Sequence, residues 1–411
     1  MKLFYMNVEI NFIRNQILLQ FFIVNNYFLY LLNANNFIII FNTVLIFIFF
    51  FNTLIDNVKK RLFFIKATII IYSIISLGSP LIEWDARGIW LFHAKRIFFD
   101  ENVYAQLDNY IPKSHNDYPV LVASLSASLA NLINGWNEIF PKFANVLLMT
   151  SPFLFLSSIL KNKFKELLFV FIIFFIMGKR IIVGEMDMLQ STYFILNIIC
   201  LGLLLFHSSK NLNKYIIFYT ILNLLIYSHL RPESYYISIL IFLSALLINF
   251  FKENKINFSI FIYLIISFIP IFYWKYLVAN SSILSITNEL FTLNLFYSRI
   301  FDFNFYFKIF ELLFYSKNAI ISIIFLAYFI FSFLIYDKEN KLFYYNYNLL
   351  KQNPIAIYLL CMSFIYFVII FISIFNSIYA YDMLVEIGRF RYNLPVSLAL
   401  CYGAMLCNYK N

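Results

Sequence analysis

The sequence predicts an all-α, polytopic membrane protein, and three observations support this fold class. Of the 411 residues, 62% are hydrophobic and only 13% are charged, a balance that water-soluble globular domains do not have. Apolar runs of about twenty residues, long enough to cross a hydrocarbon core of roughly 30 Å, recur along the chain. Basic residues cluster between these runs, as they do in cytoplasmic loops. We therefore expect about twelve transmembrane helices in a single transmembrane domain over 1–411.

The expected crossing helices follow the apolar runs in order. They cover 16–33, 37–55, 62–82, 143–160, 167–183, 188–206, 214–229, 233–250, 257–279, 317–336, 354–375 and 395–408. The run at 118–134 is Ser-rich and shorter than its neighbours, so we expect it to enter the membrane partly, buried against protein, or to lie in the interface. Residues 280–316 alternate apolar with charged residues, which indicates amphipathic helices along the interface.

The distribution of charge predicts the orientation. The basic clusters at 59–61, 161–165, 210–214, 252–255 and 338–341 all lie on one side of the membrane when both termini are cytoplasmic. In that topology the outer segments hold balanced acidic and basic residues, so the formal charge of +10 lies on the inner face. The basic composition therefore reflects orientation in a cytoplasmic (inner) membrane and not nucleic-acid binding.

The first outer loop, 83–117, concentrates charged and titratable side chains between apolar runs. Traced as a helix, its middle carries an apolar stripe at spacings of three and four, formed by Ala86, Ile89, Trp90, Ala94 and Ile97. An amphipathic helix riding on the membrane surface, with snorkelling cations, would explain the stripe. So many charges at a bilayer surface are nevertheless costly unless they face water, a partner or a substrate. The residues concerned are Glu83, Asp85, Arg87, His93, Lys95, His115, Asp117 and Tyr118.

Three later outer turns also carry acids or arginines at the mouths of helices. These residues are Glu185 and Asp187, Arg231 and Glu233, and Arg389 and Arg391. An acid at a helix N-terminus is stabilised by the helix dipole, which is a sufficient structural explanation for the carboxylates. The arginines could snorkel to lipid headgroups, but cations kept on the outer face oppose the orientation bias, which favours a functional role.

In the order of these short motifs the sequence resembles the GT-C type of integral-membrane glycosyltransferases, which includes protein O-mannosyltransferases and the lipid A aminoarabinose transferase. Glu83-Trp84-Asp85 resembles the acidic motif of the family's first outer loop, and Asp117-Tyr118-Pro119 the step that ends that loop. Glu185-Met186-Asp187 is similar to the second-loop acid, and 389–395 to the Arg-Tyr and Pro of the final outer loop.

A further motif, Arg231-Pro232-Glu233, resembles the Lys-Asn-Glu-Gly step that begins a later helix of the family. The sequence departs from the family pattern in two places. A tryptophan separates Glu83 from Asp85 where many members have adjacent acids, and Pro232 and Ser234 replace the Asn and Gly of the later step. These departures concern subfamily and substrate more than fold.

The resemblance implies a GT-C-like core at 62–250, with amphipathic interface helices in the first outer loop, followed by C-terminal helices and outer loops in 251–411. It implies transfer of a sugar from a polyprenyl-phosphate donor, usually with inversion, to a glycan, lipid or protein acceptor on the non-cytoplasmic face. Asp85 and Asp187 would then be catalytic, with Asp85 as the general base. The expected substrate-binding residues are Glu83, Arg87, His93, Lys95, His115, Asp117, Tyr118, Glu185, Arg231, Glu233, Arg389 and Arg391.

A divalent metal ion is an open question at this stage. Some relatives hold one between loop carboxylates, and oxygen ligands from Asp85 and Asp187 would suit magnesium or manganese. The spacing of these residues in the sequence does not define a metal site, so we assign no metal ligand.

Other functions remain open. A lipid-linked oligosaccharide flippase or other transporter would place charges near the bilayer midplane, whereas Lys66 and Lys275, the charges well within expected spans, lie near enough to an end to snorkel. An O-antigen polymerase or ligase would carry a large arginine-rich outer loop, and 280–316 offers only Arg299. A structural subunit without catalysis would leave the charge cluster at 83–96 unexplained.

Overall fold

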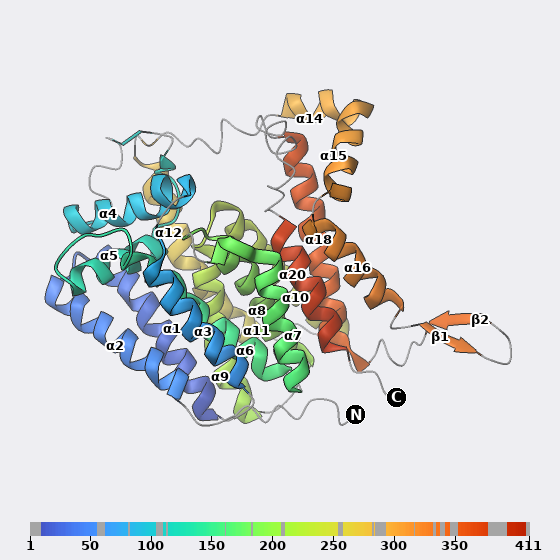
Figure 1. The fold of residues 1–411 in the computed structure, drawn as a ribbon, viewed down its shortest axis with the longest axis horizontal. Coiled ribbons are helices and arrows are strands. Elements are labelled where there is room, and N and C mark those ends of the chain that lie inside the picture. Colours follow the sequence, from blue (N-terminus) through green and yellow to red (C-terminus); the bar gives the residue numbers. More distant parts are fainter. Residues whose placement is uncertain are drawn as a thin grey trace. The chain divides into compact units, whose positions relative to one another are not determined.

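The computed structural model is a helical membrane protein (Figure 1). The structure describes residues 10–55, 62–80, 83–103, 110–111, 114–160, 162–181, 184–206, 210–253, 258–281, 283, 293–315, 317–331, 334–337, 342–345, 352–376 and 393–407. These residues form helices, short turns and one two-stranded hairpin. They separate into an amino-terminal unit, 10–170 and 177–283, and a carboxyl-terminal unit, 171–176 and 293–407.

Within the described ranges, 6 helices are long and apolar enough to cross a bilayer. They are α2 (Asn36–Ile55), the continuous run of η5 (Pro141–Phe143) and α6 (Ala144–Ile159), α8 (Asp187–Phe206), α10 (Pro232–Glu253), the run of α11 (Phe258–Ile265), η7 (Ile266–Phe268) and α12 (Ile269–Ala279), and α18 (Pro354–Asn376). The other expected runs are also helical but shorter or more polar: α1 (Ile10–Leu31), α3 (Phe63–Gly78), α7 (Lys163–Met177), α9 (Lys210–Ser228), α16 (Lys317–Phe331) and α20 (Leu394–Leu406).

The amino-terminal unit is built around α6 and α8, whose side chains are almost all buried. These two helices pack against each other, α1 packs on α6, α9 packs on α8, and α1 and α9 pack on each other. Helix α2 is different, because it packs on α1 and leaves Phe41, Phe51 and Ile55 exposed. Such aromatic and aliphatic exposure suits a lipid-facing helix, since hydrocarbon solvates these groups as well as a protein core does.

The segment 83–117, which we expect to be the first outer loop and refer to by that name, folds as predicted along its apolar stripe. A π-helical turn η2 (Ala86–Trp90) continues into α4 (Leu91–Asp100), and all five residues of the stripe are buried. Helix α4 packs on α5 (Leu121–Leu132), which also contacts α1 and α2. The residues directly after α4 are hydrogen-bonded to the α1–α2 turn, because Asn36 donates to Glu101 (2.7 Å) and Asn102 donates to Asn33 (2.9 Å). The loop is therefore a packed cap over this end of the unit (Figure 1).

Helix α5 occupies the run that was expected to enter the membrane only partly. It has 12 residues, which at 1.5 Å each gives about 18 Å, less than a hydrocarbon core of roughly 30 Å. Its residues from Leu121 to Ala130 are buried, including Ser124, Ser126 and Ser128. The serine hydroxyls of Ser124 and Ser128 donate to backbone carbonyls within the helix, so this short helix is covered by protein and not by lipid.

The carboxyl-terminal unit is simpler. Helix α20 packs against α16 and α18, and the Ser322 and Ser397 hydroxyls share a hydrogen bond of 2.7 Å. The amphipathic helices expected within 280–316 are α14 (Leu293–Ile300) and α15 (Phe303–Tyr315); along α15, Phe305 and Ile309 are buried while Phe303 and Phe307 are exposed. The helix expected over 317–336 ends at Phe331, and β1 (Leu334–Asp337) instead pairs antiparallel with β2 (Leu342–Tyr345).

Candidate functional site

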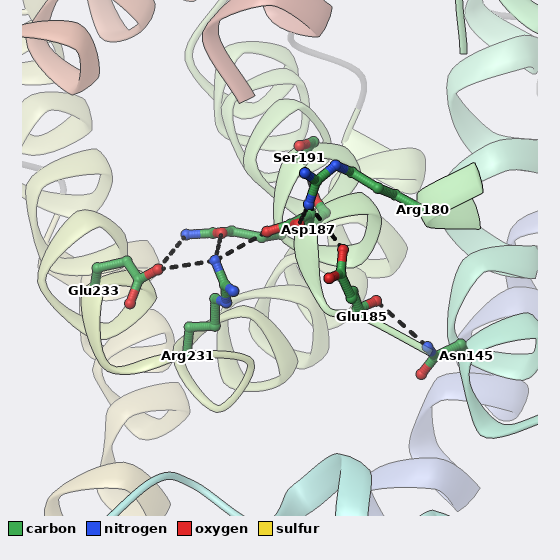
Figure 2. A network of polar contacts seen from close by, with 8 residues as sticks. Asn145, Arg180, Glu185, Asp187, Ser191, Arg231 and Glu233 are labelled. Carbon is green, nitrogen blue, oxygen red and sulfur yellow. Dashed lines mark hydrogen bonds and ion pairs between the residues drawn. The ribbon is translucent and has the colours of Figure 1, made fainter. Parts of the chain in front are cut away.

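A buried ion-pair network joins three helix mouths of the amino-terminal unit. Asp187 lies at the start of α8, and its two carboxylate oxygens each contact a different arginine. Oδ2 accepts a hydrogen bond from Arg180 Nη1 (2.7 Å), and Oδ1 forms an ion pair with Arg231 Nη1 (3.0 Å). The same Arg180 nitrogen also contacts Glu185 Oε2 at 2.8 Å. Figure 2 shows Asp187 held between the two guanidinium groups. We call Arg180, Glu185, Asp187 and Arg231 the mouth network.

The local sequence explains how these side chains reach one another. Gly178 ends α7 with φ +54 and Gly184 has φ +85, a left-handed backbone that glycine adopts without steric cost. Between them the short helix η6 (Gly178–Ile181) carries Arg180 toward Glu185 and Asp187. On the next connection, Pro232 begins α10 at the first helical position, as proline often does, and leaves Arg231 in the turn just before the helix.

Glu233 and Gln190 extend the mouth network along α10 and α8. Arg231 Nη1 lies 3.4 Å from Glu233 Oε1 and donates to Gln190 Oε1 at 3.3 Å. Gln190 Nε2 in turn donates to Glu233 Oε1 at 3.3 Å. Asp187 is 2% exposed, whereas the Glu233 side chain is 38% exposed. The network therefore runs from a buried carboxylate to one that reaches the surface of the unit.

The end of the first outer loop lies next to Arg231. Burial lowers the pKa of His115, while the carboxylates of Asp117 and Asp85 oppose this shift and the charge of Arg231 adds to it. Three loop residues and an arginine of the mouth network thus lie close enough for their charges to interact. The end of the first outer loop and the α9–α10 connection therefore lie near each other within the amino-terminal unit.

The backbone around His115 is unusual. His115 has φ +55, a left-handed conformation that is uncommon for a side chain other than glycine and that concentrates at functional sites. Its ring lies 4.5 Å from that of Tyr118, and Tyr118 in turn lies 5.6 Å from Trp90. The buried Trp274 of α12 donates its indole N–H to the Asp117 carbonyl at 3.3 Å. Aromatic packing and this hydrogen bond fix the loop against the helices.

Other predicted site residues of the loop lie in different settings. His93 is buried, and its Nε2 contacts the carbonyls of Ser114 (2.9 Å) and His115 (3.2 Å), which favours a role in holding the loop together. Arg87 and Glu138 form an exposed ion pair at 3.4 Å. Lys95 is exposed on α4, and Glu83 and Asp85 are half-buried before η2.

Two predicted residues, Arg389 and Arg391, lie outside the described residues. Two residues of the site were not predicted, Arg180 and Gln190. Arg180 follows Lys179 at the end of an apolar run, where an arginine is most simply explained as a snorkelling cation. Gln190 lies one turn after Asp187 within an apolar helix, and its spacing of three from Asp187 was the signal that it shares that carboxylate's face.

Asp187 is poorly placed to bind a divalent metal ion. Both oxygens of Asp187 already face guanidinium groups, which neutralise the charge that would attract Mg²⁺ or Mn²⁺. Among the described residues, no group of three or more His, Cys, Asp or Glu side chains is arranged to hold a metal ion. We therefore do not assign Asp187 as a metal ligand.

Comparison of the chain with protein-family models, with curated proteins and with solved structures found no match.

Proposed function

We propose that this protein is a membrane glycosyltransferase that moves a sugar from a polyprenyl-phosphate-linked donor to an envelope glycan, lipid or protein acceptor. In this proposal the chain crosses the cytoplasmic membrane about twelve times, both termini are cytoplasmic, and the first outer loop and the mouth network face outward. The resemblance of the motifs to GT-C enzymes supports the reaction type.

One observation carries the proposal. His115 lies within electrostatic range of Asp85 and Asp117 of its own loop and of Arg231, which forms an ion pair with Asp187. Residues separated by about a hundred positions in a chain poor in charge therefore gather at one end of one helical unit. A purely structural scaffold needs no such concentration, since each charge removed from water costs free energy.

The proposed reaction is an in-line displacement at the anomeric carbon. The acceptor hydroxyl oxygen forms a bond to that carbon, the bond from the carbon to the phosphate oxygen breaks, and the acceptor proton passes to the Asp85 carboxylate. Asp85 suits the role of base because it is half-buried and accessible. The displaced polyprenyl phosphate leaves with a negative charge that guanidinium groups stabilise well.

Asp187 has a positioning role in this proposal. By pairing with Arg180 on one oxygen and Arg231 on the other, its carboxylate fixes the orientation of both guanidinium groups. A group held in place before the substrate arrives loses little entropy on binding. This differs from the expectation that Asp187 is itself catalytic, because a carboxylate held between two arginines is stabilised in its charged form and is a poor proton acceptor.

A transporter of lipid-linked saccharides is the second candidate, and one observation favours it. Uncharged polar side chains, Gln20, Asn197 and Asn223 among them, are fully buried near the middle of α1, α8 and α9. Transporters place polar groups at this depth to bind their substrate.

The test is a deletion strain complemented with wild type, Asp85→Asn or Asp100→Asn. Asp100→Asn is the matched control, because Asp100 lies in the same loop at the end of α4. Envelope glycans and polyprenyl-linked sugars are measured by mass spectrometry, and protein levels by immunoblot. We expect deletion to remove one glycan modification and to accumulate its lipid-linked donor on the outer leaflet.

The variants then test the mechanism. We expect Asp85→Asn to reduce the rate of transfer about 100-fold or more at normal protein level, while Asp100→Asn restores wild-type glycans. Full activity of Asp85→Asn would remove the assigned base. If deletion instead traps a lipid-linked intermediate on the inner leaflet, with all transferases intact, the protein is a transporter and the transferase proposal is wrong.

A further inference from the structure

A ladder of buried amides runs through the middle of the amino-terminal unit. Gln16 and Gln20 lie one turn apart on α1, and Tyr219 and Asn223 lie one turn apart on α9. Asn197 of α8 completes the ladder. All five side chains have 0% exposure. We call Gln16, Gln20, Asn197 and Asn223 the amide ladder.

Hydrogen bonds between helices connect the ladder in two layers. In one layer, Tyr219 donates to Gln16 Oε1 at 3.1 Å and shares a hydrogen bond of 2.7 Å with Ser151 of α6. In the other layer, Gln20 Nε2 donates to Asn223 Oδ1 at 2.6 Å. Asn197 Nδ2 donates to the backbone carbonyls of Tyr193 (2.9 Å) and Asn223 (3.4 Å). Four helices thus meet at these polar groups.

Each amide of the ladder uses only one of its two ends. Within the described part of the chain, Gln16 Nε2, Gln20 Oε1, Asn197 Oδ1 and Asn223 Nδ2 have no hydrogen-bond partner. Asn223 lies beside the Tyr219 hydroxyl, yet its Nδ2 makes no hydrogen bond to it. Exchanging the nitrogen and oxygen of an amide exchanges a leftover donor for a leftover acceptor and removes neither.

The four amide atoms without a hydrogen-bond partner determine which kind of ligand they can bind. Two are donors and two are acceptors, and the four amides that carry them are neutral. A cation would face the amide N–H groups and an anion the carbonyl oxygens, with no opposite charge to balance either one, which is costly at this depth. Water has two donors and two acceptors, no charge, and binds buried polar groups of this kind in most folded proteins.

We propose that the amide ladder is a closed binding site for ordered water inside the helical unit. The water molecules bridge the leftover ends of Gln16, Gln20, Asn197 and Asn223 and so satisfy polar groups that the helices leave unpaired. This water site is independent of the glycosyltransferase function. The hydrogen bonds between the helices by themselves account for one end of Gln16, Gln20 and Asn223 and leave the other end without a partner.

Radiolytic footprinting of the full chain in lipid nanodiscs tests this proposal. Hydroxyl radicals generated from water in place oxidise the nearest side chains, and ¹⁸O-labelled water marks the products for mass spectrometry. Tyr219 reports on the ladder, and Tyr402 of α20, also with 0% exposure, is the matched control. We expect Tyr219 to be oxidised severalfold faster than Tyr402. Equal slow oxidation of the two tyrosines would overturn the proposal, and this comparison needs no variant.

Two further measurements separate a closed site from a channel open to bulk water. The double variant Gln16→Leu/Asn223→Leu removes two leftover amide ends, and oxidation of Tyr219 should fall to the level of Tyr402. Cys200, buried on α8 and near Tyr219, should resist a charged methanethiosulfonate reagent. Reaction of Cys200 with that reagent, or unchanged oxidation of Tyr219 in a folded double variant, would overturn the closed site.

Discussion

The mouth network and the amide ladder are two buried polar groups of one helical unit, and they use opposite chemistry. The mouth network is fully ionic, with two guanidinium groups and two carboxylates that meet at helix ends. The amide ladder is uncharged and lies at the middle of α1, α8 and α9. Its members are 0% exposed, whereas the Arg180 side chain keeps 19% exposure. The buried charges of the mouth network are thus paired with one another, and the network reaches the surface of the unit through Arg180.

The polar side chains that a membrane protein can bury depend on their depth in the bilayer. An ion moved to the middle of a bilayer loses far more solvation free energy than an amide does, so burying an amide there costs less. At a helix mouth, water and helix dipoles lower the cost of a charge, and a paired carboxylate between two arginines becomes stable. In our proposals the first group faces a charged phosphate and the second holds neutral water.

The largest effect should come from removing a charge of the mouth network. Arg231→Met leaves Asp187, which is 2% exposed, with one guanidinium in place of two, and should destabilise the protein by about 3 kcal/mol or more. The melting temperature in detergent measures this loss. Asp187→Asn combined with Arg231→Met should restore part of it, because the buried charge is gone; no recovery in the double variant would show that the two residues do not act as a pair.

The buried His93 of the first outer loop allows the cost of burying a charged side chain, relative to a neutral one, to be measured by a change of pH. Burial lowers the pKa of His93 to about 4, and Arg96 adds to the shift, against about 6.5 in an unfolded chain. The unfolded chain therefore takes up the proton first, so stability is complete above pH 6.5 and falls as the pH drops toward 4. Between pH 7 and pH 5 this histidine alone should account for a loss of about 2 kcal/mol.

The control for this pH dependence is His93→Gln, whose amide N–H can still donate to the Ser114 and His115 carbonyls without titrating. Its melting temperature should decline less between pH 7 and pH 5 than that of wild type. Parallel decline of the two proteins would mean that His93 is not the group that titrates.

A smaller effect is expected in the amide ladder. Asn223→Leu deprives Gln20 Nε2 of its acceptor at 2.6 Å and should cost about 1 kcal/mol, because hydrogen bonds between transmembrane helices contribute little net free energy. Gln20→Leu/Asn223→Leu should recover most of that loss, since both partners are then apolar. A cost as large as that of Arg231→Met would break the distinction between the two groups.

The smallest effect should come from the exposed ion pair of the first outer loop. Arg87 and Glu138 are each more than half exposed, so Arg87→Ala should change stability by at most about 0.5 kcal/mol. Thermal unfolding at low and high salt measures it. A larger loss of stability that does not depend on salt would mean that Arg87 stabilises the protein through packing and not through the exposed ion pair.

Local sequence patterns predicted the helices well. The apolar runs that form α2 and α18 are long, so their positions follow from hydropathy alone. The stripe of the first outer loop, from Ala86 to Ile97, is buried as its spacing predicted. The expected helix over 317–336 ended early because a hairpin begins at Leu334, and apolar residues such as Leu, Ile and Tyr fit a strand as well as a helix.

Hydrophobic periodicity and charge are local properties of the chain, so the helical membrane class, the positions of the helices and the acids and arginines at helix mouths can be predicted from the sequence. The ion pair of Arg180 with Asp187 and the hydrogen bond of Gln20 to Asn223, 203 residues away, are visible in the tertiary structure alone. The reason is physical: an isolated polar residue in an apolar run is equally compatible with snorkelling, a cap or a partner. Its role is fixed when helix packing brings a second polar group within hydrogen-bond distance.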